Sequence, residues 1–317
     1  MALTTFDFEK PVVELETKLE SLRAKKRKDE KTKDEIKSLK GKLEETRKEI
    51  YGNLTAYQRV MLARHQARPH AVDYIRTLTT DFQELHGDRS YSDDKAVICG
   101  LAEFDGHSCA VIGQQKGSDT KQNIEFNFGM MHPDGYRKAL RVMKLAAKFH
   151  LPILIFIDTP GAYCGVEAEE RGQFEAIAHN IREMFTLRTP VICTVIGEGA
   201  SGGAIGIGVA DRLLMMENSW YSVISPEGCA SILWRDAAYG PEAAQALKLT
   251  AQDLKELGIT DEIVSEPLGG AHRNPEVAFK NLRRAISRHL RELLALSLDN
   301  LQERRFAKYR SVGEWTQ

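Results

Sequence analysis

The chain has 317 residues, of which 42% are hydrophobic, and a formal net charge of −1. This length suffices for a sizeable core, and the balanced charge excludes nonspecific binding to nucleic acid or anionic membranes. No apolar run approaches the roughly 18 residues that cross a bilayer, and the first residues do not resemble a secretory signal. The five cysteines are scattered without C-x-x-C spacing, which argues against a disulfide framework and a thiolate zinc site. We therefore expect a cytoplasmic protein that requires neither nucleic acid nor a membrane.

The first 50 residues differ from the rest in charge, with 14 Lys and Arg and 12 Asp and Glu. Apolar residues recur at helical spacing within residues 15–22 and 36–50, and a polar run at 23–33 separates the two groups. The pattern predicts a charged N-terminal arm over residues 1–50, folded as a helical hairpin. Its narrow apolar stripe must be buried against something, so the arm is either a surface appendage or a docking element.

From about Lys95 the pattern changes to strands that alternate with helices. Asp105-Gly106 between two apolar runs predicts a hairpin with strands over residues 96–104 and 108–113. The run ILIFI at 153–157 is typical of a strand that is covered on both faces. The other expected elements are helices at 135–150, 167–188 and 202–210, strands at 191–196 and 213–216, and a helical tail at 275–305. This alternation indicates α/β layers.

A glycine-rich stretch at residues 197–204, GEGASGGA, follows an expected buried strand and opens a helix of small residues. Backbone N–H groups can approach a ligand closely in such a turn, and a helix N-terminus favours negative charge. The stretch also fits a purely structural use, in which the glycines allow tight packing of strand on helix.

Two functional interpretations of this stretch depend on residues further along the chain. The stretch matches the dinucleotide-binding pattern G-x-G-x-x-G, and Glu217 stands where a ribose-binding acid would be sought. It also matches the nucleophile elbow G-x-S-x-G around Ser201, and Asp211 and His272 follow in the order of a catalytic triad.

A third interpretation is an oxyanion hole, in which the backbone amides of Gly202 and Gly203 donate to an oxygen that gains charge. A second glycine turn, residues 158–165, follows ILIFI and precedes another expected helix. Turns that follow neighbouring parallel strands meet at one edge of the sheet, so the two turns should converge there. Asp158 could be a catalytic acid, but we expect it rather to cap the turn that follows it.

Seven stretches that are spread over the chain carry a family resemblance. They are GDRSYSDDKAV (87–97), GYRKALRVMKLA (135–146), FIDTPGAY (156–163), EERGQFEAIA (169–178), VIGEGASGGA (195–204), SVISPEGCASILW (222–234) and EPLGGAHRNP (266–275). With these motifs the whole chain resembles the alpha-subunit family of bacterial acetyl-coenzyme A carboxylase carboxyltransferases. Two positions depart from the family pattern, because Cys164 stands where proline is usual and Ala200 where glycine is usual.

The resemblance implies a crotonase-like α/β fold, a spiral of ββα units, over residues 51–317, with the helical tail from about residue 275. It implies an enzyme of fatty acid biosynthesis that transfers the carboxyl group of carboxybiotin to acetyl-coenzyme A and forms malonyl-coenzyme A. The biotin is then carried on a separate carrier protein, and this subunit holds no metal. The expected partners are a zinc-containing beta subunit, which is required for activity in an α2β2 assembly, the biotin carboxyl carrier protein and biotin carboxylase.

The resemblance also implies which residues act. Gly202 and Gly203 are the expected catalytic residues, through the backbone N–H groups of an oxyanion hole. The expected substrate-binding residues are Gly161, Ala162, Tyr163, Gly199 and Ser201. Carboxyl transfer places charge on the biotin ureido oxygen and on the thioester oxygen, so it requires donors rather than a nucleophile. A Ser201 hydrolase and an assembly scaffold whose partner holds the chemistry are the alternatives from other functional classes.

Overall fold

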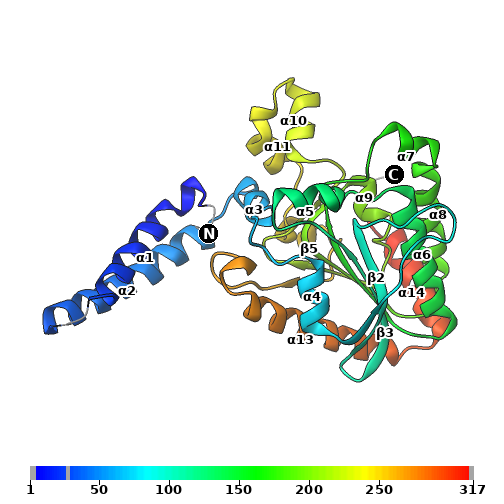
Figure 1. Ribbon diagram of the computed structural model, residues 1–317, viewed down its shortest axis with the longest axis horizontal. Helices are drawn as coiled ribbons and strands as arrows, with labels where there is room; N and C mark the ends of the chain where they lie inside the picture. The colour runs from blue at the N-terminus through cyan, green and yellow to red at the C-terminus, as the bar shows by residue number, and fades with distance from the viewer. Residues whose placement is uncertain (1–4, 26–28, 314–317) are drawn as a thin grey trace.

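The computed structural model describes residues 5–25 and 29–313 (Figure 1). These residues form one eight-stranded sheet in the order β1-β2-β3-β4-β5-β6-β8, and β7 pairs with the end of β5. The strands are β1 Thr80–Glu84, β2 Val97–Phe104, β3 His107–Gln114, β4 Ile153–Thr159, β5 Val191–Ala200, β6 Arg212–Met216, β7 Trp220–Ser222 and β8 Glu262–Val264. The first three strands are antiparallel, and β3, β4, β5, β6 and β8 run parallel.

Helices cover both faces of the sheet (Figure 1). They are α1 Lys10–Arg23, α2 Glu30–Gly52, α3 Ala56–Ala63, α4 Ala71–Leu78, α5 Thr120–Glu125, α6 Pro133–Lys148, α7 Val166–Glu170, α8 Gln173–Thr186, α9 Ser201–Ile205, α10 Pro226–Trp234, α11 Gly240–Ala246, α12 Ala251–Glu256, α13 Pro275–Leu294 and α14 Leu298–Arg310. Alternate residues of each central strand point into two separate cores, one under α6 and α8 and the other under α4 and α13.

The strongest local predictions are confirmed. Phe104 pairs with His107 across the hairpin, and Asp105 and Gly106 both adopt the left-handed conformation that such a two-residue turn requires. All seven residues of β4, which contains ILIFI, are buried between the two layers of helices. Burial of each of these large side chains contributes about 1.5–3 kcal/mol to folding, so this strand anchors the centre of the sheet.

Three expected helices differ from prediction in extent. The helix expected at 167–188 is two helices, because Gly172 adopts a left-handed conformation (φ 82°) immediately before α8. The tail is likewise broken, because the Ser297 side chain accepts from the Asn300 N–H and starts α14. The helix expected at 202–210 ends at Ile205, whereas the preceding strand extends to Ala200. No helix or strand was predicted for the segment that forms α3, α4 and β1.

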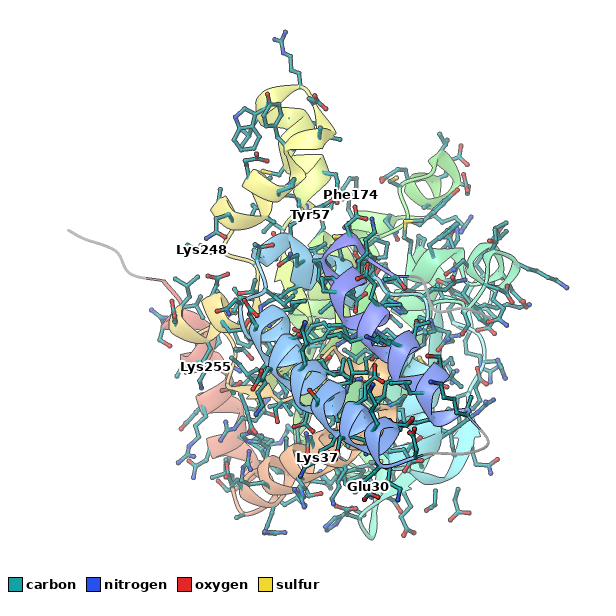
Figure 2. All side chains as sticks on the ribbon, turned by 90° about the vertical axis from the view of Figure 1, so that its left-hand side faces the viewer. Glu30, Lys37, Tyr57, Phe174, Lys248 and Lys255 are labelled. Atoms are coloured by element: carbon teal, nitrogen blue, oxygen red, sulfur yellow. The ribbon has the colours of Figure 1, made fainter. Side chains whose placement is uncertain are left out.

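The N-terminal arm is a helical hairpin, as expected. Its apolar residues, among them Leu19 and Leu43, are buried between α1 and α2, while Glu30 and Lys37 lie on its exposed surface (Figure 2). The stripe is therefore buried within the hairpin itself, whereas we expected it to be buried against another part of the chain or a partner. Ion pairs and one ring contact join the arm to the body: Arg273, which precedes α13, contacts Glu9 at 3.3 Å and Glu16 at 3.2 Å, and the Phe6 ring packs edge-on against His65. No helix in residues 5–25 and 29–313 is long and apolar enough to cross a membrane.

Candidate active site

The two glycine turns meet at the carboxyl edge of the sheet, as the sequence predicted. Strands β4 and β5 are parallel neighbours, and Thr159 pairs with Gly199 near their ends. Beyond the strands, a Cβ on Gly203 would lie 2.3 Å from the carbonyl carbon of Gly161 and 2.7 Å from the nitrogen of Ala162. Only glycine allows this approach, so the backbones of the two turns are in direct contact.

The short helix α9 starts in this contact. Ser201, its first residue, is exposed and has a left-handed backbone (φ 54°), whereas Gly202 is half-buried and Gly203 is buried. The first N–H groups of a helix have no partner within the helix, and among the described residues no side chain caps this one. Main-chain donors are therefore concentrated where the two turns touch.

A mainly apolar hollow of about 370 Å3 lies beside these donors. Its lining comprises Ser201, Gly202, Ile205, Tyr221, Ser222, Val223, Leu247, Lys248, Leu254, Leu257 and Ile259. The hollow can hold a small uncharged group with its polar end at the glycine turn, because apolar walls exclude water and strengthen hydrogen bonds there.

The other expected site residues have different surroundings. Gly199 is buried inside β5, where a Cβ would meet the Tyr221 ring at 2.5 Å. Tyr163 is half-buried, its ring centroid lies 4.3 Å from that of His132, and its N–H donates to the Met131 carbonyl. Of the two departures from the family pattern, Cys164 is exposed and Ala200 is buried as the last residue of β5.

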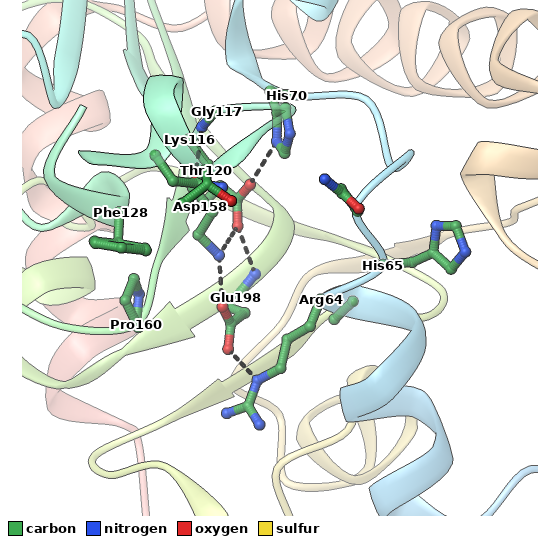
Figure 3. Close-up of a pocket in the computed structure, with 13 residues that line it drawn as sticks. Arg64, His65, His70, Lys116, Gly117, Thr120, Phe128, Asp158, Pro160 and Glu198 are labelled. Atoms are coloured by element: carbon green, nitrogen blue, oxygen red, sulfur yellow. Dashed lines mark hydrogen bonds and ion pairs between the residues drawn. The ribbon is translucent and has the colours of Figure 1, made fainter. Parts of the chain in front are cut away.

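A chain of charged side chains behind the turns was not foreseen from the sequence (Figure 3). The Lys116 Nζ, just after β3, lies 2.8 Å from Asp158 Oδ1 and 2.5 Å from Glu198 Oε2. The Arg64 Nε lies 2.6 Å from Glu198 Oε1, and His70 Nδ1 lies 3.5 Å from Asp158 Oδ2. These residues line a second cavity of about 480 Å3. These charged side chains connect the ends of the three adjacent strands β3, β4 and β5.

Asp158 does not cap its own turn, contrary to our expectation. Its Oδ1 accepts from the N–H of Glu198 on the neighbouring strand at 3.0 Å, and Gly197 makes room for it, since a Cβ there would lie 2.5 Å away. Burial raises the pKa of Asp158, but Lys116 and His70 lower it by more. The pKa of Asp158 therefore lies well below the usual range for a carboxyl group. Burial likewise lowers the pKa of Lys116, and the two carboxylates raise it overall. This arrangement keeps the pair charged and makes Asp158 a poor proton donor.

The dinucleotide interpretation is wrong. Gly197 and Gly199 lie inside strand β5, whereas the fingerprint places its glycines in a loop between strand and helix. The carboxylate of Glu217 accepts a hydrogen bond from the backbone N–H of Glu266 at 2.9 Å, so it already has a partner within the protein.

The triad interpretation is also wrong. Asp211 binds Arg305 and the N–H of Val191, at the start of β5, while Ser201 follows the end of that strand. Ten residues of extended strand span roughly 33 Å. His272 stacks on His65 at 3.8 Å between centroids, and burial and the neighbouring positive groups lower its pKa to about 3. The three side chains do not form a relay.

Among residues 5–25 and 29–313, no group of three or more His, Cys, Asp or Glu could hold a metal ion.

Comparison with known proteins identifies the family. A family model described as "Acetyl co-enzyme A carboxylase carboxyltransferase-like" matches residues 5–313. The acetyl-coenzyme A carboxylase carboxyl transferase subunit alpha of Burkholderia mallei is 55% identical over 318 residues, which cover 99% of this chain and 98% of the relative. The corresponding subunit of Chlorobaculum parvum is 54% identical over 331 residues, with 100% and 98% coverage. The chain belongs to this family of carboxyl transferase alpha subunits.

Solved structures show the same fold at low sequence identity. Transcarboxylase 12S matches with a TM-score of 0.56 at 18% identity over 70% of this chain, which spans about two fifths of that protein. The beta subunit of geranyl-CoA carboxylase from P. aeruginosa matches with a TM-score of 0.55 at 15% identity, and the match covers 83% of this chain and 48% of that one. These matches confirm the expected crotonase-like carboxyltransferase fold.

Proposed function

We propose that this chain, together with a beta subunit, transfers the carboxyl group of carboxybiotin to acetyl-coenzyme A and so forms malonyl-coenzyme A. Family membership supports the reaction class. The observation that carries the proposed mechanism is the contact of Gly203 with Gly161 and Ala162, which gathers backbone donors at the edge of an apolar hollow.

The donors act on charge that develops during the reaction. Carboxybiotin supplies the carboxyl group and, once that group has left, a basic ureido function for the acetyl proton. The N–H groups of Gly202 and Gly203 donate to an oxygen that becomes negative, and loss of one such donor typically costs about 3–4 kcal/mol of transition-state stabilisation. The chain needs no nucleophile for this role, so Ser201 only contributes polarity at the rim of the hollow.

The hollow fits an uncharged ring with a polar oxygen at one end. Its lining is mostly apolar, and Gly202 forms part of its wall. We assign Gly161, Ala162 and Tyr163 to the opposite side of the same opening, because their turn (residues 158–165) touches Gly203 in the turn at residues 197–204. Gly199 supports the site by letting the Tyr221 ring lie against β5.

The proposed assembly includes a zinc-containing beta subunit in an α2β2 arrangement, with biotin carboxylase and the biotin carboxyl carrier protein as further partners. Helix α10 projects from the body of the molecule (Figure 1), and large apolar side chains on and after it are exposed, which supports a partner surface there. They are Ile232 (71%), Leu233 (64%), Trp234 (43%) and Tyr239 (46%). We propose residues 51–317 as the carboxyltransferase domain and residues 1–50 as an assembly arm.

The decisive experiment is co-expression with the beta subunit of the same organism, followed by an assay for malonyl-coenzyme A from carboxybiotin and acetyl-coenzyme A. The assembled complex should form product, and neither subunit alone should. A Gly202→Val complex keeps the backbone N–H but places its side chain in the hollow beside it, so its rate should fall about 100-fold with assembly intact, the loss expected when reacting groups are displaced by about 1 Å. Product formation at the normal rate by this variant would show that the chain is a scaffold, and a wild-type complex without product would refute the proposed reaction.

A further inference from the structure

Gln114, the last residue of strand β3, links the two glycine turns through its side chain. It is completely buried. Its Nε2 donates to the carbonyl oxygen of Gly203 at 2.7 Å, and its Oε1 accepts from the N–H of Asp158 at 3.2 Å. One amide thus bonds to the main chain of both turns, because Asp158 starts the turn at residues 158–165 and Gly203 lies in the turn at residues 197–204.

The bond to Gly203 replaces a helical hydrogen bond. In a continuing helix, the carbonyl of Gly203 would accept from the N–H of Ile207. That N–H donates to Ala204 instead, since α9 ends after Ile205. The side chain of Gln114 supplies the missing donor, and it fixes the orientation of a backbone whose own flexibility is the greatest of any residue type.

We propose that Gln114 is a positioning residue for carboxyl transfer, and that its side-chain amide holds the glycine turn of α9 in register with the turn after β4. The inference rests on the proposed function, because the turns matter only if they supply the oxyanion donors. Lys116, two residues further on, contacts the side chains of Asp158 and Glu198, whereas Gln114 bonds to the main chain of both turns.

The neighbouring residue offers a matched control. Gln115 is also buried (4% exposed), and its side chain also makes two hydrogen bonds to main chain. These go to the N–H of Val72, in α4, and to the carbonyl of Lys116, not to either glycine turn. Gln114→Met and Gln115→Met therefore remove the same groups from the same strand end, and only the first releases the turns.

The test compares both variants with the wild type as complexes with the beta subunit. Melting temperatures should fall similarly in both variants. For Gln114→Met, kcat per assembled complex should fall about 100-fold, the loss expected when reacting groups move by about 1 Å, while the KM for acetyl-coenzyme A stays within about twofold. For Gln115→Met, kcat should stay close to that of the wild type.

A third variant separates the two contacts. Gln114→Glu keeps the shape and the acceptor for Asp158 but places a carboxylate against the carbonyl of Gly203, so its kcat should fall as in Gln114→Met. Equal kcat values for Gln114→Met and Gln115→Met would overturn the proposal. Gln114 would then contribute only to the stability of the fold. If the wild-type complex itself forms no malonyl-coenzyme A, the proposed function fails, and this inference fails with it.

Discussion

Alanine in place of Gly203 would put a methyl group into the contact between the two glycine turns. Its Cβ would lie 2.3 Å from the carbonyl carbon, 2.6 Å from the oxygen of Gly161 and 2.7 Å from the nitrogen of Ala162. All three atoms belong to the backbone, so no side chain can rotate away. The two turns must move apart by about 1 Å to restore an ordinary contact, a rearrangement of the kind that overpacked cores undergo.

The magnitude of the effect follows from this displacement. Overpacking of a close-packed site typically costs about 1–3 kcal/mol, and we expect Gly203→Ala to lose this much free energy of unfolding. A shift of about 1 Å in a catalytic donor can lower the rate about 100-fold. Alanine at Gly202 would meet only the tip of the Ile177 side chain, at 3.3 Å. Because alanine favours a helix over glycine by about 1 kcal/mol, Gly202→Ala should be as stable as the wild type or more so.

Thermal unfolding and malonyl-coenzyme A formation by the assembled complex measure the two effects. Gly203→Ala should melt earlier and work about 100-fold more slowly, whereas Gly202→Ala should retain its melting temperature and most of its activity. A Gly203→Ala complex that melts and reacts like the wild type would refute the argument that the contact of the two turns sets the site.

Three further predictions concern other parts of the chain. Ser201→Ala should keep most of the activity in the same assay, because the proposed mechanism forms no acyl-enzyme; stoichiometric labelling of Ser201 by a serine-directed phosphonate would contradict this. Deletion of residues 1–50 should weaken association with the beta subunit in sedimentation experiments. The remaining residues should still fold, since they lose mainly the ion pairs of Arg273 with the arm. Unchanged association would show that the arm is a surface appendage. Since the pKa of Asp158 is lower in the folded chain than its ordinary 3.8, the stabilisation by this carboxylate is present above about pH 4 and is lost as the pH falls further. Urea unfolding from pH 7 toward pH 3 should therefore show a smaller loss of stability for Asp158→Asn than for the wild type, and equal losses would exclude this role.

Local patterns in the sequence determined much of the fold. Asp105-Gly106 defined its hairpin, ILIFI defined the central strand, and the spacing of leucines defined the two helices of the arm. Such features depend on backbone preferences and side-chain periodicity over a few residues, which the sequence expresses directly. The convergence of the glycine turns was also predictable, because neighbouring parallel strands present their carboxyl ends at one edge.

Only the tertiary structure decided which polar side chains support the site. Gln114 and Lys116, Glu198 and Arg64 come from three segments that are far apart along the chain, and nothing in the local sequence around each predicts its partner. Because these side chains are largely buried, each needs a hydrogen-bond or charge partner, since burial of an unpaired polar group costs folding free energy. The partners are set by the strand order β3-β4-β5, which brings the ends of these segments together. The same long-range geometry separated Asp211 from Ser201, and no spacing in the sequence could reveal that distance.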